Sequence, residues 1–426
     1  MGKRAADDPL KDITSSVGTE LGGKRIVLGV TGSVASIEIP SLARELMRHG
    51  ADVNVVMSEA AEKLVRPETL QWATGNPVVR RLTGETEHVK LAGEWRGRAH
   101  LVLIAPCTAN TISKMALGID DTPVTTIASM ALGGKIPLII CPAAHAPMYT
   151  NPAVQANITT LKQRGAILVE PSLKEGKAKM ASIQEIVEAV IRIFAKQDLK
   201  GLKILVTGGP TVEFIDPVRV ITNLSSGKMG TTFAGEAARR GAEVLYVYGG
   251  NLEPPLGVDS AKVLTTEEMR KAVMKNLESG RFDVFVSTVA PADFAPVSPA
   301  SKKIPTSAGQ MTMVFKPTPK IIEEVRKRWP KIFLVALKAE TIPKNSALKS
   351  AGEAFRAKSK ADVVVANDVS EGKGFGADDN SVLVISKGRT LELTQRPKEE
   401  IARRILDVVT ELLDRKADRP LRHSPK

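Results

Sequence analysis

The feature that most constrains this chain is a repeated order of short apolar runs, turns and helical segments. Residues 24–30 form an apolar run that ends at Thr31-Gly32-Ser33, and residues 37–50 then follow the 3.6-residue period of a helix. Similar runs at 51–57, 100–106, 135–141 and 166–171 follow, with helical segments among them and a long amphipathic one over 183–194. Strands that alternate with helices predict a parallel sheet with helices on its faces.

The same order starts again near residue 201. Apolar runs occur at 204–209, 242–250, 282–290, 332–340 and 361–368, most of them separated by helical segments. Two more runs, at 381–386 and 390–394, flank a turn at 387–389 and predict an antiparallel pair before a final helix over 398–413. The predicted fold class is therefore α/β, with two doubly wound, Rossmann-like parallel sheets and a small antiparallel addition to the second.

Chain length and one polar stretch define the expected domains. A chain of 426 residues is longer than the roughly 100 to 200 residues typical of one domain. Residues 195–201 are polar and lack apolar periodicity, so we place the boundary there. We predict a first domain at 23–195, a linker at 196–200 and a second domain at 201–418, with an N-terminal extension at 1–22 and a C-terminal tail at 419–426.

Composition narrows the classes of partner. The formal net charge of +13 suits nucleic acid or anionic small molecules, but aromatic residues make up only 4% and no zinc spacing is present, so we expect no nucleic-acid partner. No run approaches the roughly 18 apolar residues of a membrane span, and the N-terminus lacks the apolar middle of a signal peptide. We expect a cytoplasmic protein with no membrane partner. Cys107 and Cys141 each end an apolar run, as buried packing thiols do, and two cysteines provide no disulfide framework.

The first two apolar runs end in candidate ligand-binding turns. Ligands of open parallel sheets bind at the carboxyl ends of the strands. Gly32 permits close approach of the backbone and Ser33 supplies a hydroxyl, although a lone glycine turn is as often structural as functional. The second run ends at Met57-Ser58 and lacks the acidic residue that binds ribose in a dinucleotide site. This favours a mononucleotide over NAD.

Further polar residues are expected at the same edge. Thr108 and Asn110 follow the third run, where a helix cap needs only one such side chain, and His145 and Met148 follow the fourth. His88 lies in an expected loop ahead of the third run. A lone histidine is usually a surface or hydrogen-bonded residue, a class to which we assign His49, His100 and His423. We favour function for His88 and His145, because both can reach the ligand edge.

In the second half, residues 208–230 form a long polar segment ahead of a helix, and loops of this length are usually functional. Its SSGK end, at 225–228, is similar to a phosphate cradle. Thr222 stands where a Walker A loop has its first glycine, and Met229 replaces the serine or threonine, so an ordinary P-loop nucleotidase is disfavoured. The alternative is a capped helix start with a solvated lysine.

Residues 24–170 carry the motifs TGSVAS, LQWATGNPV, HVKLA, APCTANTISKMALGIDD and PAAHAPMY, which together resemble the family of flavin-containing cysteine decarboxylases. The resemblance implies that family's fold, an FMN cofactor, a catalytic role for His88, and catalytic or substrate contacts from His145 and Met148. The implied reaction oxidises the cysteinyl thiol of the substrate by hydride transfer to FMN, loses CO2 from the thioaldehyde and returns the hydride. The implied FMN contacts are Gly32, Ser33, Ser58, Thr108 and Asn110.

The first half departs from this family in two places. Bacterial members carry Met then Asn in the motif that clamps the substrate, whereas this chain has Ala144 then His145, which can still donate a hydrogen bond to a carboxylate. Those members also carry a cysteine that donates a proton from a flap, and the matching stretch here, EPSLKEGKAKMAS, has none. We expect Lys177, Lys179 or water to protonate the product instead.

Residues 201–411 resemble the phosphopantothenate-cysteine ligase family, through ITNLSSGKMG, VAPADF, SKKI, LKAET, VVANDV and KGFGADDN. In that family a carboxylate attacks the α-phosphate of CTP, and cysteine displaces CMP from the acyl-cytidylate, with Mg2+ and lysines offsetting the charge. The resemblance implies that Asn223 steadies the acyl-cytidylate, and that Asp293 and Lys303 contact the ribose and the triphosphate. Lys302 is the alternative to Lys303. The implied CTP loop is Ser225, Ser226, Gly227 and Lys228.

Arg356, Lys358 and Lys360 are three alternative basic residues for binding the phosphate of the substrate, and we choose Lys358. Together the two resemblances imply a bifunctional enzyme of coenzyme A biosynthesis that takes 4'-phosphopantothenate, cysteine and CTP. They also imply homo-oligomers, with trimers through the flavin domain and dimers through the ligase domain. The alternatives are an NAD-dependent dehydrogenase, which needs a glycine fingerprint that neither half shows, and a flavin-binding regulatory protein.

Overall fold

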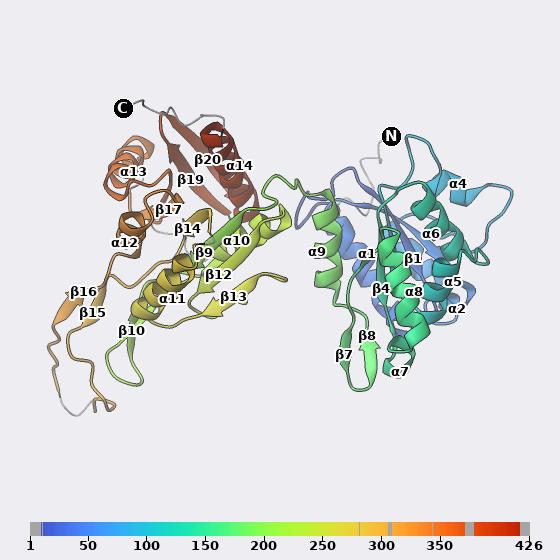
Figure 1. Cartoon of the computed structure of the whole chain (residues 1–426), viewed down its shortest axis with the longest axis horizontal. Helices are drawn as coiled ribbons and strands as arrows, with labels where there is room; N and C mark the ends of the chain where they lie inside the picture. The colour runs from blue at the N-terminus through green and yellow to red at the C-terminus, as the bar shows by residue number, and fades with distance from the viewer. Residues whose placement is uncertain are drawn as a thin grey trace, which may run out of the picture. The chain divides into compact units, whose positions relative to one another are not determined.

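The computed structural model describes residues 10, 12–280, 282–305, 309–342, 344–370 and 379–417. The tail expected at 419–426, much of the extension expected at 1–22 and most of the KGFGADDN motif lie outside these residues. The chain divides into two compact units, residues 1–195 and 196–426 (Figure 1). Each unit is described by itself below.

The first unit contains a five-stranded parallel sheet in the order β2-β1-β3-β4-β6. Its order reverses between β1 and β3, which makes that gap the topological switch point. Buried β-branched and leucine side chains on both faces give these strands their near-continuous apolar sequences. The strands are β1 (Arg25–Val30), β2 (Asp52–Met57), β3 (Leu101–Cys107), β4 (Leu138–Pro142) and β6 (Ile167–Leu168).

Helices cover both faces of this sheet. One core joins the strands to α1, α3 and α9, and the other joins them to α5, α6 and α8. The unit is therefore doubly wound, as the sequence predicts. Its helices are η1 (Val34–Glu38), α1 (Ile39–Arg48), α2 (Glu59–Glu62), α3 (Pro67–Thr74), α4 (Glu87–Ala92), α5 (Ala109–Leu117), α6 (Pro123–Gly133), α7 (Ala146–Tyr149), α8 (Pro152–Gln163) and α9 (Ile183–Phe194).

A small antiparallel sheet that the sequence analysis missed follows β4 and β6. Its strands, in the order β5-β8-β7, are β5 (Ala144–His145), β7 (Ser172–Lys174) and β8 (Lys177–Lys179). Glu175 and Gly176 join β7 to β8 with φ angles of 52° and 68°, the left-handed conformation that two-residue hairpin turns use. Mostly polar, very short strands carry little periodicity, which explains the omission. We call β7 and β8 the flap hairpin.

The second unit contains an eight-stranded sheet in the order β13-β12-β9-β14-β17-β18-β19-β20. The first six strands are parallel, with a switch point between β9 and β14, and β19 and β20 add antiparallel strands at one edge. This confirms the predicted addition. The strands are β9 (Lys203–Gly208), β12 (Glu243–Tyr248), β13 (Asp259–Lys262), β14 (Val284–Ser287), β17 (Phe333–Glu340), β18 (Val363–Asp368), β19 (Asp379–Ser386) and β20 (Arg389–Pro397).

Helices also cover both faces of the second sheet. One core contains residues of α10 and α14, and the opposite core contains residues of α11 and α12. The helices are α10 (Lys228–Arg239), α11 (Thr266–Glu278), α12 (Ile321–Arg328), α13 (Asn345–Ser359) and α14 (Lys398–Ala417). Within the described residues, no helix is both long enough and apolar enough to cross a membrane.

Two hairpins extend from the carboxyl edge of this sheet. They are β10 (Val212–Phe214) with β11 (Val220–Thr222), and β15 (Phe294–Pro296) with β16 (Phe315–Pro317). The segment 208–230 is therefore not a continuous loop, as its polar sequence suggested. Three-residue strands stabilised by polar contacts at their turn are too short to show a period of two.

Candidate functional sites

The turns after β1 and β3 meet at the first switch point. Thr31 Oγ1 donates a hydrogen bond to the carbonyl oxygen of Pro106 at 2.6 Å and accepts one from the backbone N–H of Thr108 at 3.1 Å. The Thr31 side chain is buried. The structure thus brings the glycine turn and the Thr108 loop side by side, as expected of neighbouring parallel strands. The turn is recognisable in the sequence, whereas the linking role of Thr31 is not.

Close packing makes glycine necessary in the first of these turns. A Cβ atom added to Gly32 would lie 2.5 Å from the Cβ atom of Ala60 in α2, far inside a normal contact. The backbone N–H of Ser58 also donates to the carbonyl oxygen of Val30 at 3.0 Å. The turn after β1 therefore packs directly against α2 at Gly32, with no room for a side chain at that position.

The hydroxyl groups at this edge cap helices. Ser33, Ser58 and Thr108 each accept a hydrogen bond from a backbone N–H two or three residues later, at 3.3–3.4 Å. These long bonds are weak, so each oxygen can exchange its partner for a ligand atom. Asn110 lies in the first turn of α5 and is exposed.

His88 lies in a short helix, and the expected loop at this position is wrong. Helix α4 begins after Thr86, whose φ is 51°, and its first residue Glu87 accepts hydrogen bonds from the backbone and hydroxyl of Thr83. Those bonds lower the pKa of Glu87 to about 2. Nδ1 of His88 is buried and has no hydrogen-bond partner among the described residues. A buried ring nitrogen without a hydrogen bond raises the free energy of the folded protein, so we expect a ligand or another protein group to bind it.

The flap hairpin places a lysine opposite His145. In the β5–β8 pairing, His145 faces Lys177, and their side chains therefore project from the same face as direct cross-strand neighbours. Lys179 instead forms an ion pair with Glu175 at 2.6 Å, and this bond lowers the pKa of Glu175. Met148, in α7, keeps 53% of its surface exposed. His145 and Lys177 thus lie side by side, and Met148 lies in the short helix that follows His145.

Both cysteines are free and fully buried. Burial raises the pKa of the Cys107 thiol and that of the Cys141 thiol well above the ordinary value, and the proximity of Cys107 contributes further for Cys141. A thiol that resists ionisation in an apolar core is a packing group. The prediction of buried thiols is confirmed.

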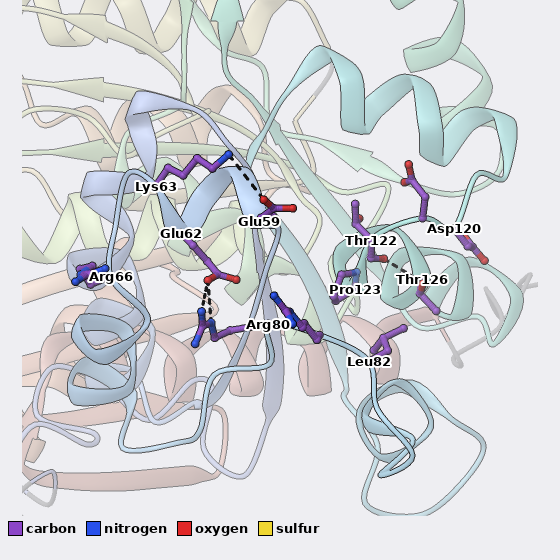
Figure 2. A pocket seen from close by; sticks show the side chains of 12 residues that line it. Glu59, Glu62, Lys63, Arg66, Arg80, Leu82, Asp120, Thr122, Pro123 and Thr126 are labelled. Carbon is purple, nitrogen blue, oxygen red and sulfur yellow. Dashed lines mark hydrogen bonds and ion pairs between the residues drawn. The ribbon is translucent and has the colours of Figure 1, made fainter.

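A hollow of about 690 Å³ lies beside α2 (Figure 2). Charges of both signs line it, and an ion pair joins Glu62 to Arg80 across one side. None of the predicted flavin contacts lines it, although Asp120 and Asp121 of the ALGIDD motif do. Three separate segments form this hollow, so no single stretch of sequence indicates it. Its lining residues are Glu59, Glu62, Lys63, Arg66, Arg80, Arg81, Leu82, Asp120, Asp121, Thr122, Pro123 and Thr126.

At the second switch point, the loops after β9 and β14 bind each other through their backbones. Pro210 pairs with Ala290 in a parallel bridge, and the N–H of Ala290 donates to the carbonyl oxygen of Gly209 at 2.9 Å. Gly209 has a φ of 75°, and an added Cβ would lie 2.1 Å from the carbonyl oxygen of Gly249. Only glycine fits there.

Side chains strengthen this junction. Thr211 Oγ1 accepts the backbone N–H of Ala292 at 2.9 Å, and Thr222 Oγ1 donates to the carbonyl oxygen of Thr211 at 2.9 Å. Asn223 Nδ2 donates to the carbonyl oxygen of Pro291 at 2.8 Å. The structure therefore brings Asn223 and the VAPADF loop together, as the two motifs suggested. The role of Thr211 was not visible in the sequence.

The SSGK stretch lies at the same edge. Gly227, with a φ of 78°, precedes helix α10, and its added Cβ would lie 3.2 Å from Cα of Gly209. Ser225 and Ser226 accept long hydrogen bonds from the backbone N–H groups of Gly227 and Lys228, at 3.3 and 3.4 Å. The stretch thus starts a twelve-residue helix whose N-terminus points to the switch point.

Asp293 and Lys358 contact residues at the start of α12. Asp293 forms an ion pair with Lys320, the residue before α12, at 2.5 Å. Lys358, in the last turn of α13, pairs with Glu323 in the first turn of α12 at 3.3 Å, and both side chains are at least half exposed. No contact among the described residues joins Lys358 to Asn223 or Asp293 directly.

Lys302 and Lys303 are exposed, and the residues on either side of them bind the turn of the β10–β11 hairpin. The backbone N–H of Ala300 donates to the carbonyl oxygen of Ile215 at 2.9 Å, and that of Ile304 donates to the buried carboxylate of Asp216 at 3.2 Å. The described residues contain no cluster of three or more His, Cys, Asp or Glu side chains that is suited to hold a metal.

Each unit thus contains an open sheet with a parallel core and hydrogen-bonding loops at its switch point, the place where α/β proteins of the doubly wound class bind nucleotides. Two family models match the chain. One, described as "Flavoprotein", matches residues 14–195, and the other, described as "DNA/pantothenate metabolism flavoprotein C-terminal domain", matches residues 199–413.

Relatives that match nearly the whole chain carry one shared name. The chain is 45% identical to the coenzyme A biosynthesis bifunctional protein CoaBC of Thermococcus kodakarensis, over 95% of this chain and 99% of the relative. It is 37% identical to the protein of that name from Methanocaldococcus jannaschii, over 95% and 98%. A solved C-terminal domain of a CoaBC protein is 32% identical, with a TM-score of 0.44, and covers 52% of this chain and all of that one.

The chain belongs to the family of coenzyme A biosynthesis bifunctional proteins CoaBC. It is a bifunctional enzyme of coenzyme A biosynthesis, with a flavoprotein decarboxylase domain followed by a ligase domain. Membership supports this function over the two alternatives, a dehydrogenase and a regulatory flavoprotein.

Proposed function

We propose that the second unit joins 4'-phosphopantothenate to cysteine at the expense of CTP, and that the first unit then decarboxylates the product to 4'-phosphopantetheine with FMN. This proposal rests on one observation: a single chain of this family contains two switch points that differ in the polar groups around them. The first offers a turn in which only glycine fits and three weakly bonded hydroxyl groups. The second offers a network of hydrogen-bonded loops.

The residues at the first switch point fit FMN. The turn at Gly32 admits no Cβ, and the weak caps at Ser33, Ser58 and Thr108 leave hydroxyls that can bind phosphate. When bound there, FMN supplies a hydride acceptor that takes the hydride from the cysteinyl group and later returns it.

The chain's own groups handle protons and orientation. His88 accepts the thiol proton at a ring nitrogen as the cysteinyl group is oxidised. His145 donates a hydrogen bond to the substrate carboxylate, beside Met148, and so aligns the bond that breaks when CO2 leaves. Of the two lysines considered as proton donors to the enethiolate, Lys177 is favoured because it faces His145, whereas Lys179 is held by Glu175.

In the second unit, groups that are already held in place stabilise the negative charge of the triphosphate and of the acyl-cytidylate. Asn223, fixed by Pro291, steadies the acyl-cytidylate, and Asp293 binds the ribose hydroxyls. The serines and Lys228 at the start of α10, together with Lys303, bind the triphosphate, whose oxygens also bind Mg2+. Lys358 remains our choice for the phosphate of the substrate.

We also propose homo-oligomers, with trimers through the first unit and dimers through the second. Large apolar side chains that stay exposed near the two hairpins of the second unit support the dimer: Val218 (64%), Leu224 (83%) and Phe294 (55%). Light scattering on the full chain tests this, and a monomeric mass would contradict it.

The proposed function is tested by incubating the purified, yellow protein with 4'-phosphopantothenate, cysteine, CTP and Mg2+, followed by mass analysis. We expect CMP, pyrophosphate, CO2 and 4'-phosphopantetheine. Omission of CTP should stop all product formation, whereas supplied phosphopantothenoylcysteine should be decarboxylated without it. Failure to form phosphopantothenoylcysteine, or its persistence in the presence of bound FMN, would contradict the corresponding half of the proposal.

A further inference from the structure

Asp216 is a buried carboxylate at the turn of the β10–β11 hairpin. Its side chain has no exposed surface, although Val218 beside it is 64% exposed. Oδ1 accepts the backbone N–H groups of Val218 and Arg219, each at 2.8 Å, and this bonding closes the turn. Oδ2 accepts Nη1 of Arg219 at 2.6 Å and the backbone N–H of Ile304 at 3.2 Å. The two oxygens therefore have separate tasks.

The bond from Ile304 joins segments that are 88 residues apart in sequence. Two further bonds reinforce it. Nη1 of Arg219 donates to the carbonyl oxygen of Ile304 at 3.0 Å, and the N–H of Ala300 donates to the carbonyl oxygen of Ile215 at 2.9 Å. The described backbone between β15 and β16 is thus attached to the hairpin on both sides of Lys302 and Lys303.

This attachment matters because the segment has little other support. Between Pro296 and Phe315, the other backbone hydrogen bond among the described residues joins Val297 to Val314, at the base of the β15–β16 hairpin. Lysine side chains are long and lose rotamer entropy when they bind. Fixing the backbone at both ends of a two-lysine stretch lowers the remaining entropic cost of placing their charges on a triphosphate.

We propose that Asp216 is a positioning residue for ligation, which sets the place of Lys302 and Lys303 relative to the nucleotide loop. The proposal rests on the proposed function, since it takes the triphosphate of CTP as the group that these lysines meet. Asp216 itself touches no substrate. Its carboxylate acts through Ile304 and Arg219 at the turn of the hairpin. At the base of the hairpin, Thr211 accepts a bond from Thr222, and Asn223 binds Pro291 of the VAPADF loop.

The informative variant is Asp216→Asn. An asparagine that keeps its oxygen at the Oδ1 position retains both bonds of the turn, but its NH2 group cannot accept from Ile304 or Arg219. We expect the KM for CTP to rise about tenfold or more, because a displaced binding group loses effective concentration. The KM for cysteine should not change, and decarboxylation of supplied phosphopantothenoylcysteine by the same preparation should keep its rate.

Two inhibitors separate positioning from general damage. Inorganic tripolyphosphate competes for the triphosphate subsite alone, and cytidine competes for the nucleoside subsite alone. In Asp216→Asn, inhibition by tripolyphosphate should weaken by the same factor as the KM for CTP rises, and inhibition by cytidine should stay at the wild-type level. Equal weakening of both would show a structural role and overturn the proposal.

Asp362→Asn is the matched control. Oδ2 of Asp362 accepts the backbone N–H of Leu334 and Nη2 of Arg326, both at 2.9 Å, so it uses the same two kinds of donor. It lies at the start of β17 and β18, away from the carboxyl edge. An equal rise in the KM for CTP in this variant would also overturn the proposal.

If Asp216→Asn does not fold, a second variant tests the same hydrogen bond from its other partner. Ile304→Pro removes the N–H that reaches Asp216 and leaves the carboxylate in place. It should raise the KM for CTP in the same direction, and an unchanged KM would contradict the proposal. If the wild-type protein itself does not ligate with CTP, the proposed function fails; if the wild type ligates and both variants match it, the positioning role alone fails.

Discussion

The two switch points differ in how far the chain satisfies its own polar groups. Apart from the bonds of Thr31, the hydroxyls of the first site accept long hydrogen bonds from backbone two or three residues away. In the second site, Ser225 and Ser226 do the same, but Thr211, Asn223 and Asp216 bond to residues 68 to 88 positions away.

This difference follows the chemistry expected of each site. A site that holds an organic cofactor needs open backbone and weakly engaged hydroxyls, because the cofactor completes the hydrogen bonds. A site that stabilises charge on a transient acyl-cytidylate gains from donors that are already fixed before the substrate binds. The first site therefore depends on its ligand for completion, and the second is largely preassembled.

The largest effect that tests this contrast is expected from His88→Asn. The variant should lower decarboxylation by roughly 100-fold to 10,000-fold, because an amide cannot move a proton as an imidazole does. Ligation, which occurs in the other unit, should be unchanged, so phosphopantothenoylcysteine should accumulate. Mass analysis of the coupled reaction measures both effects.

His100→Asn is the control for that variant. Nδ1 of His100 accepts the N–H of Arg25 at 2.9 Å near the amino ends of β1 and β3, away from the ligand edge. Its decarboxylation rate should match that of the wild type. Wild-type CO2 release by His88→Asn would remove His88 from the mechanism.

The next effect concerns the second site. Asn223→Asp replaces the amide donor with a carboxylate that faces the carbonyl oxygen of Pro291 and an anionic intermediate, so ligation should fall by about 100-fold or more. Decarboxylation of supplied phosphopantothenoylcysteine should persist. Release of pyrophosphate from CTP gives the ligation rate.

Asn276→Asp is the matched control, since Nδ2 of Asn276 also donates to a backbone carbonyl, that of Ala272 within α11, at 2.8 Å. Its ligation rate should stay close to that of the wild type. If both substitutions slow ligation equally, loss of the amide donor affects the fold, and Asn223 has no special place in the site.

A smaller effect is expected from Gly32→Ala. The new methyl group would clash with Ala60, and overpacking of about 1–3 kcal/mol should weaken FMN retention by roughly tenfold or more. Flavin absorbance after gel filtration measures it. Gly133→Ala, at a position with open space in α6, should retain the wild-type flavin content. Full flavin in the Gly32 variant would place FMN elsewhere.

The smallest effect should come from the double variant Cys107→Ala, Cys141→Ala. Both thiols are buried packing groups, so the variant should keep FMN and still form 4'-phosphopantetheine, with a proton from Lys177 or water. The product is followed by mass analysis. A reaction that stops at the enethiol while FMN stays bound would identify a cysteine as the proton donor.

The two parallel sheets and the turns after the first strands could be predicted from the amino-acid pattern alone. Buried strands such as β3, and β1 after Arg25, are apolar throughout, and helices such as α9 carry apolar residues with a period of 3.6, because each pattern reflects local burial. The antiparallel pair β19–β20 was predicted for the same reason. Gly32 and Gly227 were also recognisable, since glycine marks positions where backbone must approach closely.

Which polar side chains meet could be learned only from the folded chain. The facing of His145 and Lys177, the helical setting of His88 and the bond between Asp216 and Ile304 depend on hairpin register and on contacts between distant segments. Such contacts leave no period in the sequence, because a single hydrogen bond constrains one side chain and one backbone group rather than a repeating face. The strands could therefore be predicted from burial, whereas the positions of the site's charges required the fold.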